Sequence, residues 1–128
     1  MFPLPIWITY EHQPEPMPFL TVLILLLCAH ALCDYPLQGN FLASAKNHLL
    51  RRAEQVIPWW HAMAAHCAIH AGAVLLITGS VFLAAAEFVL HFWTDLGKCE
   101  GLISDTQDQA IHIGCKVLWA IILVGMLQ

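Results

Sequence analysis

The chain has 128 residues, of which 59% are hydrophobic and 11% are charged, and its formal net charge is −4. Its mean hydropathy is +0.69. A chain of this length forms one domain, and the composition is too apolar for an ordinary soluble protein. There is no Gly-rich phosphate loop and no basic patch beyond a few loop charges, which excludes nucleotide and nucleic-acid binding as predicted functions. We therefore expect an integral membrane protein whose main partner is the lipid bilayer.

The chain begins with a Pro-rich lead-in, residues 1–18, and continues into a predicted four-helix transmembrane domain, residues 19–128. Four apolar segments in that domain approach the length of about 20 residues that a membrane-spanning helix needs. They predict an all-α, up-down bundle of four transmembrane helices. A soluble bundle is the alternative, but its helices would each show a polar face. The four segments are residues 17–35, 59–78, 80–97 and about 106–127.

Each apolar segment carries two potential metal ligands four residues apart. On a helix this spacing places both side chains on one face, about 6 Å apart along the axis. The pairs close the first and third segments and open the second and fourth, so in an up-down bundle all four pairs meet at one end, which we call the ligand end. The pairs are His30 and Asp34, His66 and His70, His91 and Asp95, and Asp108 and His112.

The register of the helices predicts two layers within this group. An inner ring of four imidazoles lies one turn deeper, and three carboxylates with one imidazole lie toward the ligand end. The inner ring comprises His30, His70, His91 and His112, and the outer layer comprises Asp34, His66, Asp95 and Asp108.

Ionisable groups inside a membrane cost several kcal/mol unless they pair, bind an ion or face water. A bound metal would satisfy all eight at once, and mixed imidazole and carboxylate ligands suit Zn²⁺, Mn²⁺ or Fe²⁺. We predict one or two divalent transition metal ions, with zinc as the first choice. The alternative is a hydrogen-bonded His/Asp network without metal that sets the helix register.

Several polar residues flank the eight candidate ligands. Glu87 stands one turn before His91 and Lys116 one turn after His112, so we predict an ion pair beneath the inner ring, with a proton relay as the alternative role. Lys46, Arg51 and Arg52 could contact lipid phosphates or an anionic substrate, or act only as positive charges that orient the protein in the membrane. The other residues that we expect to support the site are Gln38, Lys98 and Gln109.

The connection between the first two segments is rich in helix-forming residues from 41 to 55, which predicts a short amphipathic helix lying across the membrane surface. Basic residues in the loops at the ligand end place that end in the cytoplasm and both termini outside. The five cysteines are odd in number and form no Cys-x-x-Cys motif, so we expect small buried hydrophobic residues instead of disulfides or ligands. The basic loop residues are Lys46, Arg51, Arg52 and Lys98.

The ordered set of these motifs resembles a family of small bacterial and phage membrane proteins known as domain of unknown function 3307. The resemblance covers about residues 20–125 and implies a membrane location and a bacterial or phage origin, but no activity. Its motifs run from His30, Asp34 and Gln38 through Lys46, His66 and His70 to His91, Asp95, Lys98, Asp108, Gln109 and His112.

Two classes of function are open. The first is a metal-dependent hydrolase that acts on a lipid or amphiphile, with Asp34, Asp95 or Asp108 as the catalytic general base. The second is a non-enzymatic membrane module in which the polar residues stabilise a bundle that oligomerises, binds a membrane protein partner, or conducts metal ions or protons. An enzyme needs an open coordination position, whereas a structural site is closed.

Overall fold

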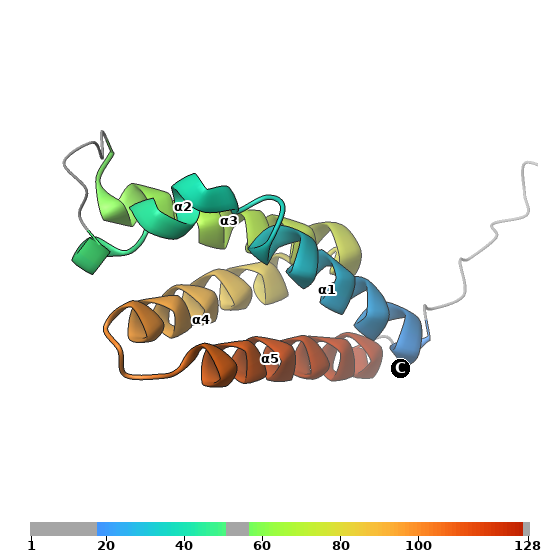
Figure 1. Cartoon of the computed structure of the whole chain (residues 1–128). Coiled ribbons are helices and arrows are strands. Elements are labelled where there is room, and N and C mark those ends of the chain that lie inside the picture. Colours follow the sequence, from blue (N-terminus) through green and yellow to red (C-terminus); the bar gives the residue numbers. More distant parts are fainter. Residues whose placement is uncertain (1–17, 51–56, 127–128) are drawn as a thin grey trace, which may run out of the picture.

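The computed structural model describes residues 18–50 and 57–126. The fold of these residues is all-α, and four long helices make up most of it (Figure 1). The helices are α1 (Phe19–Asp34), α2 (Gly39–Ala45), α3 (Trp59–Thr78), α4 (Val81–Cys99) and α5 (Asp105–Met126), with a short 3-10 helix at His48–Leu50. The predicted Pro-rich lead-in falls almost entirely outside the described residues.

The four long helices form an up-down bundle. Helix α1 packs against α3 and α5, and α4 packs against the same two helices on the other side. Each long helix is therefore antiparallel to both of its neighbours (Figure 1). The end of α1, the start of α3, the end of α4 and the start of α5 consequently lie at the same end of the bundle.

The boundaries of the helices follow from local sequence. Pro58 precedes α3, and Gly79 ends it in the left-handed conformation at φ 66°, which glycine adopts without steric cost. The Ser80 side chain accepts a hydrogen bond from the Leu83 backbone at the start of α4. Ser104 and Gln107 form a reciprocal capping box at the start of α5. The capping box at Ser104 and Gln107 lies next to Asp108, whereas Gly79 and Ser80 form the turn at the opposite end of the bundle.

Among the described residues, α3 and α5 are each long and apolar enough to cross a membrane, and α1 with α2 would make a third span if their 80° bend is counted within one span. Helix α1 alone has 16 residues, and α4 carries three charged residues. Large apolar side chains cover the outside of the bundle, such as Leu76 at 88% exposure. A membrane location is plausible on these grounds, while the count of four spans stays a prediction.

The predicted amphipathic helix over residues 41–55 is wrong in its extent. Helix α2 ends at Ala45, and the chain then turns because Asn47 bonds back to Ser44 and its side chain accepts from the Leu49 backbone. Lys46 stands at this turn, and its side chain points into the bundle. Residues 51–56 lie outside the described part of the chain.

Apolar packing fills the end of the bundle opposite to the ligand end. A core of buried residues there includes Val22, Leu26, Val74 and Leu83. The five cysteines are free, as expected. The predicted burial is confirmed for Cys33, Cys67 and Cys99, whereas Cys115 is only partly buried and Cys28 is exposed on α1.

Candidate metal centre

Eight residues, two from each long helix, meet at the ligand end, and we call them the His/Asp cluster. Seven are buried, and the Asp34 side chain is 9% exposed at the edge. The centroids of the imidazole rings are 3.8 Å apart for His70 and His91 and 4.0 Å for His91 and His112. The ring of His30 lies 5.2 Å from that of His70 and 5.3 Å from that of His112. These four imidazoles thus form a closed ring, and the other members are Asp34, His66, Asp95 and Asp108.

One set of ligand atoms in the cluster has the spacing of a metal site. Asp34, His66, His70 and His91 each offer one atom, and the four atoms lie within 4.8 Å of one another. Asp34 Oδ1 is 3.0 Å from His70 Nε2 and 3.5 Å from His66 Nε2, and the Nε2 atoms of His66 and His91 are 3.1 Å apart. Ligands at 2.0–2.1 Å around a tetrahedral ion lie about 3.3 Å apart. The geometry of this first group could therefore hold a metal ion.

A second group shares one residue with the first. His91, Asp95 and His112 also offer atoms within 4.8 Å of one another. Asp95 Oδ1 is 3.2 Å from His112 Nε2 and 3.7 Å from His91 Nε2. No cysteine joins either group among the described residues. Both groups could hold an ion, but they compete for His91.

A contact with Glu87, one turn earlier on α4, fixes the orientation of the His91 imidazole ring. His91 Nδ1 is 3.2 Å from Glu87 Oε1, and an ionised carboxylate only accepts hydrogen bonds, so Nδ1 carries the proton and Nε2 presents a lone pair to the cluster. Glu87 also accepts from Lys116 Nζ at 2.5 Å and from Trp119 Nε1 at 2.6 Å. The structure thus pairs Glu87 with Lys116. Trp119 was missed in the sequence, although it stands on the same helix face as Lys116.

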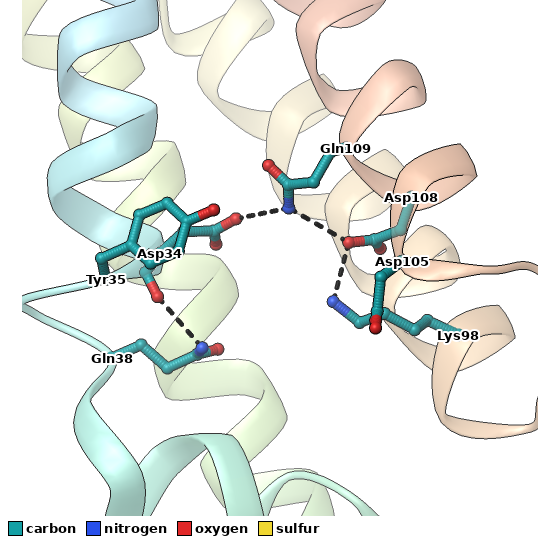
Figure 2. Close-up of a pocket in the computed structure, with 7 residues that line it drawn as sticks. All are labelled: Asp34, Tyr35, Gln38, Lys98, Asp105, Asp108 and Gln109. Carbon is teal, nitrogen blue, oxygen red and sulfur yellow. Dashed lines mark hydrogen bonds and ion pairs between the residues drawn. The ribbon is translucent and has the colours of Figure 1, made fainter.

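The side-chain amide of Gln109 contacts three members of the His/Asp cluster. Its Nε2 donates to Asp34 Oδ2 at 2.9 Å and to Asp108 Oδ2 at 3.2 Å (Figure 2). Its Oε1 lies 3.2 Å from His30 Nε2. His30 and Asp108 belong to neither ligand group, so the amide of Gln109 holds these two members of the cluster beside Asp34.

Two lysines lie against the carboxylates of α4 and α5. Lys98 donates to Asp108 Oδ2 at 2.7 Å and lies 4.0 Å from Asp95 Oδ1. Lys46 is 3% exposed, and its ammonium donates to Asp95 Oδ2. A contact of Lys46 with lipid phosphates is therefore excluded, because the side chain is directed into the bundle. The pattern of residues 41–55 carried no signal for this inward direction.

A polar cavity of about 310 Å³ opens at the ligand end beside Asp34 (Figure 2). Gln38 reaches it from the turn after α1, where its amide donates to the backbone oxygen of Asp34 at 3.1 Å. The cavity is lined by Asp34, Tyr35, Gln38, Lys98, Asp105, Asp108 and Gln109. It gives water and small polar groups access to one member of the first ligand group.

Comparison with known proteins identifies the family. The model of the family described as "Protein of unknown function (DUF3307)" matches residues 22–127. The chain belongs to this family. The match covers all eight residues of the His/Asp cluster and confirms the resemblance seen in the motifs. No curated protein and no solved structure matches the chain.

We predict that Glu87→Gln lowers the free energy of unfolding by about 3–5 kcal/mol, because it leaves the buried ammonium of Lys116 without a counter-charge. Adding Lys116→Met should recover most of that loss. The measurement is a double-mutant cycle by denaturant unfolding in detergent. Additive effects of the two substitutions would show that Glu87 and Lys116 are not coupled in the folded protein.

Proposed function

We propose that this protein is an integral membrane metal-binding protein whose His/Asp cluster holds one divalent transition metal ion. The ligands are Asp34, His66, His70 and His91, and zinc is the first choice, with manganese or iron as alternatives. The observation that carries the proposal is the 3.0–3.5 Å spacing of ligand atoms in the first group. Three imidazoles and one carboxylate also match the ligand types that zinc accepts.

One ion fits the cluster better than two because of His91. Both candidate groups need this side chain, and its Nδ1 is occupied by Glu87. The single remaining lone pair on Nε2 can bind one ion. The first group is the better site because it offers four ligands, while the second offers three.

A hydrolase is supported by the cavity that reaches Asp34. When bound, the metal would activate water and polarise a carbonyl or phosphoryl group. Asp108 lines the same cavity, where its Oδ1 lies 3.3 Å from His112 Nε2 and its Oδ2 accepts from Lys98. Among the three candidate carboxylates we take Asp108 as the general base, because Asp34 is a proposed ligand and Asp95 does not line the cavity. The polar lining suits the head group of an amphiphile and not its acyl chains.

The non-enzymatic module is supported by the polar contacts that cross the bundle. Asp34 on α1 contacts His70 on α3, and Asp95 on α4 contacts His112 on α5. Such contacts would hold the helices in register with or without turnover. In this alternative the bundle serves as an oligomeric or partner-binding scaffold, or as a conduit for metal ions or protons.

We place the protein in the bacterial inner membrane as a multi-pass chain with the ligand end in the cytoplasm and both termini outside. The support is the basic character of the connections at the ligand end. Lys46 and Lys98 form ion pairs inside the fold, and Arg51 and Arg52 lie outside the described residues. The orientation therefore depends on the sequence pattern.

We predict that protein purified in detergent contains about one transition metal ion per chain, most of it zinc. His70→Ala should lose most of the metal, because it removes a ligand. It should also lower the melting temperature, because the buried Asp34 carboxylate then loses both the ion and the imidazole that compensate its charge. Elemental analysis and thermal unfolding measure both effects. His61→Ala is the matched control, since His61 is exposed on the same helix and should keep its metal. Wild-type protein without metal, even after reconstitution, would contradict the proposal.

A second experiment separates the hydrolase from the module. Metal-loaded protein is incubated with vesicles of phosphatidylethanolamine and phosphatidylglycerol, and the released head groups and fatty acids are measured by mass spectrometry. The hydrolase predicts products that depend on metal and that fall by about 100-fold or more in Asp108→Asn, since general base catalysis contributes about that much. This variant should keep its metal, because Asp108 is not among the proposed ligands. Equal signals with loaded and metal-free protein would favour the module.

A further inference from the structure

The described residues contain three lysines, and each is paired with a different carboxylate inside the bundle. Lys116 pairs with Glu87, and Lys98 pairs with Asp108. Lys46 pairs with Asp95. Asp34 is the remaining carboxylate of the cluster, and its recorded partners are imidazoles and the amide of Gln109.

This pairing divides the cluster into two halves of different charge. The half that contains Asp95 and Asp108 carries two carboxylates and two ammonium groups, so these charges cancel. The half that contains Asp34 carries one carboxylate without an ammonium. A divalent cation gains most where a negative charge has no counter-charge and where lone pairs converge. That place is the first ligand group.

Lys46 lies at the centre of the other half. It follows directly after α2, is 3% exposed, and donates to Asp95 Oδ2. The second oxygen of this carboxylate, Oδ1, faces His112 and His91. The ammonium thus sits on the only carboxylate of the group formed by His91, Asp95 and His112.

We propose, on the basis of the metal site described above, that Lys46 is a built-in cation that masks a second metal site. The masked site consists of His91, Asp95 and His112. The Lys46 ammonium compensates Asp95 and repels a dication there, so the ion is directed to Asp34, His66, His70 and His91. Removing the positive charge of Lys46 exposes the second site.

The test uses zinc binding in a background where the first site is disabled. Purified variants are incubated with zinc, desalted and subjected to elemental analysis, and their folding is checked by circular dichroism and size exclusion. Wild-type protein should retain about one zinc ion per chain. The double variant Asp34→Asn with His70→Ala leaves only His66 and His91 of the first site and should retain almost none. Adding Lys46→Met to this double variant should restore about one ion, because His91, Asp95 and His112 are then all available. If the Met variant does not fold, Lys46→Gln in the same background replaces it. This variant has a polar side chain and should also recover zinc binding.

Three controls define the role of the charge. Lys46→Arg in the double variant Asp34→Asn with His70→Ala keeps the positive charge and should stay without zinc. Lys116→Met in the same double variant removes another buried lysine, which contacts Glu87 instead of Asp95, and should also stay without zinc. Adding Asp95→Asn to the restored variant should abolish binding again.

The outcomes separate the two proposals. Wild-type protein that binds no zinc overturns the metal proposal, and with it this inference. If wild-type protein binds zinc and the double variant Asp34→Asn with His70→Ala keeps it, only the assignment of the ion to the Asp34 half is overturned. If the double variant loses zinc and the folded combinations with Lys46→Met or Lys46→Gln do not recover it, only the masking role of Lys46 is overturned.

Discussion

The rest of the structure depends on the compensation of charge inside an apolar bundle. Carboxylates placed among helices of this composition must each find a partner, because an unpaired buried charge costs more than the fold can sustain. Glu87, Asp95 and Asp108 meet this requirement with lysines from three different parts of the chain. Asp34 meets it with imidazoles and an amide, and the proposed metal ion would supply the positive charge that no lysine gives it.

The same constraint links the fold to the chemistry of the site. The up-down order brings four helix ends together, and the imidazole ring closes across all four helices. Glu87 then turns His91 so that one nitrogen faces the cluster. The cavity beside Asp34 opens toward this centre, so water could reach an ion bound there from the Asp34 side. Such an arrangement is compatible with catalysis and with reversible binding of the ion.

Much of the cluster could be predicted from the sequence, because spacing on a helix and the order of the segments are local properties. The four-residue spacing placed both members of each pair on one face, and the alternation of closing and opening positions brought the pairs to one end. The direction of Lys46 could not be predicted, since it depends on a tertiary contact with Asp95 that no pattern in residues 41–55 encodes. Gln109 was expected to support the site, but its contacts with Asp34, Asp108 and His30 could not be predicted, and Trp119 was missed. Amide and indole groups become informative only when their distant partners are known.

The central claim is that three imidazoles and one carboxylate hold a single ion, and X-ray absorption spectroscopy of the zinc-loaded protein in detergent tests it most directly. The account predicts nitrogen and oxygen ligands at about 2.0–2.1 Å, with the multiple scattering of imidazole rings and no sulfur. A sulfur shell at about 2.3 Å, which would place the metal on cysteines such as Cys33 or Cys67, would contradict it. So would a spectrum of oxygen ligands without imidazole, which would show an ion bound outside the His/Asp cluster.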